Sequence, residues 1–184
     1  MDFELVIRRT VAGLDAAGVR YALIGGFAMA LRGLQRATVD LGFILMLEDL
    51  EKADAVLHTC GYNRVFKSEN VSHYESIEAS WGRIDILHAF RSPTMGMLTR
   101  ASRVAVAADT TIPVVQIEDL IGLKIQALVN NPVRETRDWA DIQLILEAAG
   151  ENGDTVDWEL VLSYLEIFSL ESKLPELKRY YGQA

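Results

Sequence analysis

The chain is poor in cysteine and proline, with one cysteine and four prolines in 184 residues. Cys60 alone cannot form an internal disulfide, and a chain without disulfides suits a reducing compartment, so we expect the protein in the cytoplasm. No apolar run is long enough to cross a bilayer. The first residues, Met-Asp-Phe-Glu-Leu, lack the basic segment and apolar stretch of a secretion signal. The sequence therefore predicts no membrane partner.

A surplus of positive charge is also absent. The formal net charge is -8, of which residues 1–112 carry -1 and residues 113–184 carry -7. A general nucleic-acid binder needs a basic surplus to neutralise phosphates, and neither part of the chain has one. This distribution argues against general nucleic-acid binding, but it leaves room for a small anionic substrate held by a few arginines.

What the chain does have is apolar side chains, which make up 50% of its residues and suffice for a core. Their periodicity predicts an α/β part, residues 1–112, followed by a helical bundle, residues 113–184. In the first part we expect a mixed sheet flanked by helices, with strands over 21–24, 39–45, 61–66, 70–79, 82–89, 104–108 and 112–115 and helices over 3–17, 25–33, 48–60 and 92–102. In the bundle we expect helices over 117–129, 134–149, 157–169 and 171–181, with Gly150 ending the second.

The stretch from Tyr21 to Gly42 carries the most specific pattern. An apolar strand runs into Gly25-Gly26, a helix of small residues follows, and Arg36-x-Thr38-x-Asp40 leads into the next strand. Glycines at a strand-to-helix turn let backbone N–H groups approach a phosphate closely.

This stretch resembles the signature of the nucleotidyltransferase superfamily whose prototype is DNA polymerase beta, and in particular the AbiEii-type and minimal nucleotidyltransferases. Their pattern is Gly-Gly, small residues, then Arg-x-Thr-x-Asp-x-Asp. The chain departs from it where Gly42 replaces the second aspartate, and it matches at Gly25, Gly26, Arg36, Thr38 and Asp40. The resemblance implies a nucleotidyltransferase fold, a nucleoside triphosphate (NTP) substrate and Mg²⁺ as cofactor.

The resemblance also implies a cluster of metal-binding acids. Asp40 takes the first position, and Asp85, in an apolar strand, takes the third. Side chains at i and i+2 of a strand share one face, so Gly42 leaves a gap beside Asp40. Either metal binding is weakened, or one of three nearby acids fills the gap, namely Glu48, Glu75 or Glu78.

Two further residues of the pattern have alternative roles. Arg36 either pairs with phosphate through its planar fork or forms a salt bridge to Asp40 or Asp85. Thr38 is interpreted as structural rather than catalytic, and the resemblance groups it with Gly25, Gly26 and Arg36 as nucleotide-binding residues. The three histidines have no spacing typical of metal ligands, and they are His58, His73 and His88.

Lys124 lies in the middle of the apolar stripe expected on its helix, at 100° per residue. Such a lysine either pairs with an acid, here Asp138 or Asp141, or faces a cleft. The segment 119–127 followed by 137–141 resembles the downstream helical motif of AbiEii-type proteins, whose lysine faces the nucleotide. The resemblance thus implies Lys124 as a catalytic residue.

Two hypotheses for function follow. In the first, the protein is an enzyme that transfers a nucleoside monophosphate from an NTP to a hydroxyl of a small molecule, a tRNA or a protein. In the second, the loss of an acid at Gly42 makes it a catalytically inactive nucleotide-binding or toxin–antitoxin interaction module. A homodimer, or a toxin or antitoxin partner, is compatible with either.

Overall fold

The computed structural model describes residues 3–34, 38, 40–78, 81–107 and 109–182, and of Phe3 only the backbone. The chain forms two compact units. The first comprises Met1–Leu31 and Gln35–Val115, and the second comprises Arg32–Leu34 and Gln116–Ala184. The chain thus contributes to the second unit twice.

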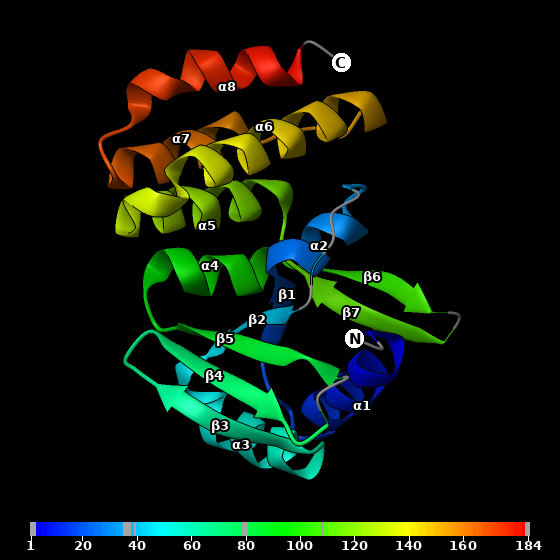
Figure 1. The fold of residues 1–184 in the computed structure, drawn as a ribbon. Coiled ribbons are helices and arrows are strands. Elements are labelled where there is room, and N and C mark those ends of the chain that lie inside the picture. Colours follow the sequence, from blue (N-terminus) through cyan, green and yellow to red (C-terminus); the bar gives the residue numbers. More distant parts are fainter. Residues whose placement is uncertain (1–2, 35–37, 39, 79–80, 108, 183–184) are drawn as a thin grey trace. The chain divides into compact units, whose positions relative to one another are not determined.

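A mixed seven-stranded sheet forms the centre of the first unit, in the order β3-β4-β5-β2-β1-β7-β6 (Figure 1). β2 pairs in parallel with β5, and β1 pairs in parallel with β7, whereas the other neighbours are antiparallel. The sheet confirms the predicted mixed topology, and its strands are β1 Tyr21–Ile24, β2 Asp40–Met46, β3 Tyr62–Lys67, β4 Val71–Ser76, β5 Arg83–Ala89, β6 Ser102–Ala107 and β7 Thr110–Val114.

Helices of the first unit cover both faces of this sheet (Figure 1). They are α1 Phe3–Ala16, α2 Gly25–Leu31, α3 Leu50–Thr59 after the short 3-10 turn η1 Leu47–Asp49, and α4 Ser92–Arg100. Alternation along the strands supplies the core, because one face of β2 and β5 carries fully buried side chains, among them Leu41, Phe43, Ile84 and Ile86.

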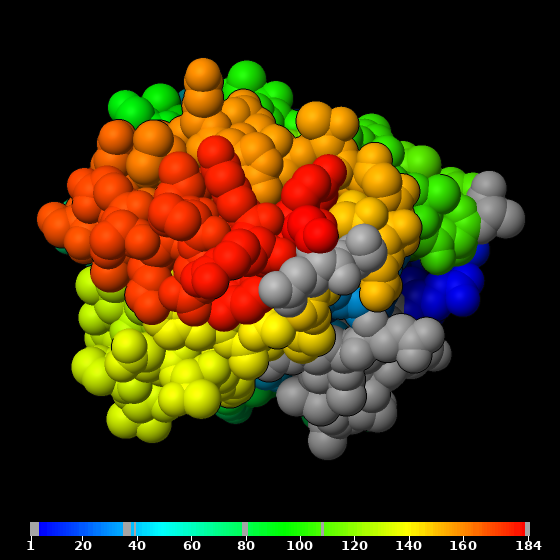
Figure 2. Space-filling model, turned by 90° about the horizontal axis from the view of Figure 1, so that it is seen from above, coloured from blue at the N-terminus to red at the C-terminus, as the bar shows by residue number. Residues whose placement is uncertain are grey.

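The second unit is helical, as the bundle prediction required. Its helices are α5 Ile117–Asn130, α6 Glu135–Asn152, α7 Trp158–Ile167 and α8 Leu174–Tyr181, with 3-10 turns η3 Pro132–Arg134 and η4 Glu171–Lys173. α5 packs against α6 and α7, and α8, red in Figure 2, lies on the outer side of α6. Among the described residues no helix combines the length and the hydropathy that a membrane span needs.

The segment Arg32–Leu34 packs with this helical unit. Arg32 donates from Nη2 to Oε1 of Gln116 at 3.2 Å. A Cβ placed on Gly33 would come within 2.9 Å of Nδ2 of Asn152, and Leu34 is buried.

One predicted helix end is wrong. We expected Gly150 to end the second bundle helix, but α6 continues to Asn152 and Gly153 is its C-cap. Gly153 has a φ of 71°, the left-handed conformation that ends many helices and that glycine adopts without strain. Gly150 is tolerated inside α6, where the adjacent Ala149 is buried in the bundle core.

Candidate functional site

Three strand ends meet at one edge of the sheet in the first unit. β1 ends at Ile24, while β2 begins at Asp40 and β5 begins at Arg83. Ile24 pairs with Gly42, and Gly42 pairs with Asp85 on its other side, so these residues form one row across the strands. Gly25 follows Ile24 directly. The ladder therefore brings the glycine turn and both predicted acids to the same edge.

Asp40 and Asp85 lie on the same face of this edge. Asp40 pairs with Arg83 and lies two residues before Gly42, so its Cα is roughly 8 Å from that of Asp85, given the strand rise and spacing. The side chain of Asp85 is 45% exposed, whereas its strand neighbours Ile84 and Ile86 are buried, as the alternation predicted.

Gly42 leaves little room for the missing carboxylate. A Cβ at this position would lie 3.2 Å from Cγ1 of Ile24 and 3.3 Å from its carbonyl oxygen. Both contacts are tight, so a side chain here requires Ile24 to move by a few tenths of an ångström. The end of β1 has thus packed against the bare backbone of β2.

The turn requires glycine at positions 25 and 26 for two different reasons. Gly25 has a φ of 73°, a conformation that L-residues adopt only with strain. Gly26 is required by close approach, because a Cβ there would meet Oγ1 of Thr38 at 2.9 Å. Thr38 in turn donates from Oγ1 to the carbonyl oxygen of Asp40 at 3.1 Å. Thr38 therefore connects the turn to the start of β2.

His73 is the residue that sequence reasoning missed. It pairs with Asp85 across β4 and β5, and its Nδ1 lies 2.6 Å from Oδ1 of Asp85. On the other side its ring stacks on Phe66 of β3, with centroids 5.2 Å apart and planes at 25°. Alternation in β4 places His73 opposite the buried Tyr74, but the register of β4 on β5, which creates the contact, has no signal in the sequence.

The three acids proposed to fill the gap at Gly42 have different surroundings. Glu75 is on the same sheet face, because it pairs with Arg83, which in turn pairs with Asp40. Its Oε1 lies 3.9 Å from Nε of Arg83. Glu48 forms an ion pair with Arg20, and Glu78 follows β4. Only Glu75 therefore shares a face with the two aspartates, and an arginine separates it from them.

Magnesium prefers oxygen ligands and is often held by one or two carboxylates together with substrate phosphates. Asp40 and Asp85 provide two such carboxylates on one face. The described residues contain no group of three or more His, Cys, Asp or Glu placed to hold a metal ion. The residues present thus fit a magnesium ion whose remaining ligands come from a bound triphosphate. By themselves they do not form a complete metal site.

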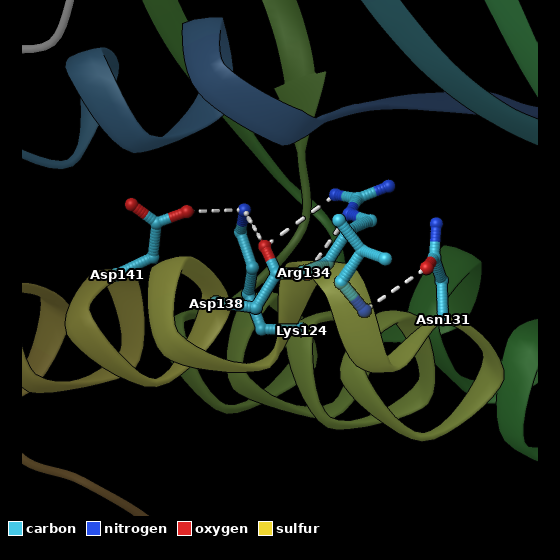
Figure 3. A network of polar contacts seen from close by, with 6 residues as sticks. Lys124, Asn131, Arg134, Asp138 and Asp141 are labelled. Atoms are coloured by element: carbon cyan, nitrogen blue, oxygen red, sulfur yellow. Dashed lines mark hydrogen bonds and ion pairs between the residues drawn. The ribbon is translucent and has the colours of Figure 1, made fainter.

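The helical unit contains a second polar cluster, around Lys124 (Figure 3). Nζ of Lys124 donates to Oδ1 of Asp138 at 3.0 Å and to Oδ2 of Asp141 at 2.5 Å. Arg134 donates from Nε to Oδ2 of Asp138 at 3.0 Å, and Asn131 accepts a hydrogen bond from the backbone N–H of Val133. α5 supplies the lysine and α6 both aspartates, so the predicted pairing of Lys124 with an acid is confirmed.

The charged side chains of this cluster are largely buried, so each of them requires a partner of opposite charge. The side chains of Lys124, Asp138 and Asp141 are 14%, 0% and 6% exposed. A charge removed from water is tolerated only when it is paired and hydrogen-bonded. Two cations face two carboxylates here, so the formal charge of the four side chains sums to zero. Arg36, predicted to pair with phosphate or with Asp40 or Asp85, lies outside the described residues.

Comparisons with known proteins show which family model and which solved structures the chain resembles. A family model described as nucleotidyl transferase AbiEii toxin, type IV TA system, matches residues 10–178. No curated protein matches the chain.

Solved structures share the fold at low identity. The antibiotic-resistance factor ANT(2'')-Ia in solution has a TM-score of 0.65 at 15% identity, covering 100% of each chain. An antigenic nucleotidyltransferase-like protein from Paracoccidioides brasiliensis has a TM-score of 0.56 at 16% identity, covering 98% of this chain and 93% of that chain. The lincosamide antibiotic adenylyltransferase LnuA has a TM-score of 0.50 at 18% identity, covering 64% of this chain and 83% of that chain.

At such identities these likenesses establish the nucleotidyltransferase fold alone, which confirms the predicted fold class. The family model goes further, because the residues it matches include the glycine turn, both aspartates and the lysine cluster. The chain therefore belongs to the AbiEii nucleotidyl transferase toxin family of type IV toxin–antitoxin systems.

Proposed function

We propose that the protein binds a nucleoside triphosphate at the edge where β1, β2 and β5 meet, and that it transfers the nucleoside monophosphate to a hydroxyl group. Asp40 and Asp85 hold Mg²⁺ together with the triphosphate, and the backbone of Gly25 and Gly26 contacts phosphate. The register that places Asp85 in one row with Gly42 and the end of β1 is the observation that carries this proposal.

The transfer is a substitution at phosphorus. The acceptor oxygen bonds to the α-phosphorus, the bond to the bridging oxygen breaks, pyrophosphate leaves, and the hydroxyl proton passes to water. A magnesium ion supplies charge neutralisation on the phosphates. The protein supplies the oxygen ligands and the glycine turn, and Thr38 lies close to Gly26 of that turn and donates a hydrogen bond to the backbone carbonyl of Asp40.

Gly42 predicts that metal affinity and turnover are low in this chain. One carboxylate fewer removes a ligand, and among the three acids considered, all of them within the described part of the chain, Glu75 alone lies on the same face, beside Arg83. We expect Gly42→Asp to raise the affinity for Mn²⁺ in the presence of ATP or CTP. Gly42→Asn, which meets the same tight contacts with Ile24 but carries no charge, is the matched control.

Calorimetry with ATP and with CTP, with and without Mg²⁺, tests the site directly. Asp40→Asn and Asp85→Asn should each weaken metal-dependent nucleotide binding by at least tenfold. If both variants bind metal and nucleotide as the unmodified chain does, the proposed site is wrong. Transfer of labelled nucleotide to small molecules, tRNA or protein then identifies the acceptor class.

A second candidate function is favoured by the same glycine. With no side chain at position 42, the protein acts as a nucleotide-binding module without turnover, working through an antitoxin or a second copy of itself. This candidate predicts binding of nucleotide by the unmodified chain and transfer only by the Gly42→Asp variant. Transfer by the unmodified chain would exclude it.

The proposed role of Lys124 as a catalytic residue is separate from these tests. The family resemblance gives it a place facing the nucleotide, while its two ion pairs already account for a structural role. A change in nucleotide affinity after its replacement, in protein that is still folded, distinguishes the two roles.

A further inference from the structure

We propose that His73 is a positioning residue that fixes the carboxylate of Asp85, and that it thereby supports the metal ligand left without a neighbouring acid by Gly42. This inference rests on the proposed function of Asp85. It assigns to the histidine no contact with substrate and no proton transfer, only control over the direction in which one carboxylate points.

The contact between the two side chains is short and well defined. Nδ1 of His73 lies 2.6 Å from Oδ1 of Asp85, slightly shorter than the range of about 2.7–2.9 Å that is usual for a nitrogen donor and a carboxylate. The two residues are direct partners in the β4–β5 ladder, so the backbone brings their side chains to the same face. The contact leaves the second oxygen of Asp85 to other ligands.

The histidine ring is itself held in place. Phe66 pairs with His73 across β3 and β4, and the two rings stack at a centroid distance of 5.2 Å. Backbone pairing therefore orders Phe66, His73, Asp85, Gly42 and Ile24 as one row across five strands. An exposed phenylalanine, 49% accessible, has a clear use in this row because it restricts the imidazole.

The row also shows why Asp85 needs such support. On one side it has His73, and on the other side it has Gly42, which offers no side chain. A carboxylate that is 45% exposed and lacks a neighbour would sample several rotamers. Groups that orient a metal ligand typically change metal affinity or activity by about 10–100-fold when they are removed.

Isosteric variants separate hydrogen bonding from ring bulk. The amide nitrogen of Asn overlays the Nδ1 position of a histidine, whereas that of Gln overlays the Nε2 position. We expect His73→Asn to keep Mn²⁺ affinity, measured by electron paramagnetic resonance with a non-hydrolysable ATP analogue, within about threefold. His73→Gln and His73→Phe should lose about tenfold or more, the lower end of the range for such supporting groups. His58→Asn, on the exposed surface of α3, is the matched control and should change nothing.

A second measurement needs neither metal nor turnover. The ¹⁵N resonance of Nδ1 of His73 should shift when Asp85 is replaced by Asn, and Phe66→Leu should broaden or move it while the protein stays folded. Equal losses in His73→Asn and His73→Phe, or an unchanged Nδ1 resonance in Asp85→Asn, would overturn the positioning role. If Asp85→Asn itself leaves Mn²⁺ affinity unchanged, the proposed function fails as well, and this outcome is distinct from failure of the histidine variants alone.

Discussion

Replacing Lys124 by methionine tests how much the positive charge of this lysine, paired with Asp138 and Asp141, contributes to the stability of the helical unit. Methionine keeps most of the volume of lysine but removes the charge. Asp138 retains Arg134, while Asp141 loses its 2.5 Å contact with Nζ. The cluster loses one of its two cations, and removing one partner from a buried ion pair costs up to about 3–5 kcal/mol. Domains are stable by only about 5–15 kcal/mol, so we expect a large fraction of the stability to disappear.

The expected loss corresponds to a decrease in Tm of roughly 6–20 °C, at about 2–4 °C per kcal/mol for a chain of this size. Urea denaturation followed by circular dichroism measures the loss of unfolding free energy, and thermal denaturation followed by the same signal measures the decrease in Tm. Adding Asp141→Asn to Lys124→Met removes one carboxylate along with the lost cation, so that Asp138 and Arg134 remain as the charged members of the four, and it should recover part of the stability. The control is Lys67→Met, whose exposed pair with Glu51 at 3.4 Å is worth at most about 1 kcal/mol. If Lys124→Met costs no more than Lys67→Met, the structural role is refuted.

Two other perturbations have defined outcomes. Gly26→Ala should cost about 1–3 kcal/mol of unfolding free energy, because its Cβ would meet the side chain of Thr38 at 2.9 Å, and Gly26→Ala combined with Thr38→Ala should recover part of it in the same urea titration. Burial raises the pKa of Asp49, but hydrogen bonds from Arg20 and Lys52 outweigh it and lower this pKa to about 2. Ionised Asp49 therefore stabilises the fold above pH 4 and loses this effect as the pH falls toward 2. Asp49→Asn should cost about 1–2 kcal/mol at pH 7, allowing for the exposed arginine, and about half as much at pH 3; an equal cost at both pH values would contradict the assignment.

Local patterns in the sequence were enough to predict most elements, whereas the two aspartates of the candidate site were named from the family resemblance. Period-two alternation places Ile84 and Ile86 inside and Asp85 outside, and helical periodicity places Lys124 among apolar residues near Asp138 and Asp141. Both patterns depend only on the backbone geometry of one element. For this reason the faces of these residues followed from the sequence, and the ion pairs of Lys124 correspond to one of the two alternatives that the sequence left open.

Contacts between strands could not be predicted from the sequence in the same way. The pairing of His73 with Asp85 depends on the register of β4 on β5, and a shift by one residue would turn every side chain of β4 to the opposite face. The tight contact of Gly42 with Ile24 depends likewise on the pairing of β1 with β2. The end of α6 was misplaced for a different reason, because two glycines three residues apart compete for the cap, and the sequence does not show which one adopts the left-handed conformation.

The short segment Arg32–Leu34 has a practical consequence for anyone who wishes to separate the two units. A chain cut near residue 115 would carry Arg32 without Gln116 and Leu34 without the helices that shield it from water. The helical piece would in turn lack three residues that no addition at its own ends could restore. Neither fragment is therefore a faithful copy of its unit, because the first retains three residues that belong to the second.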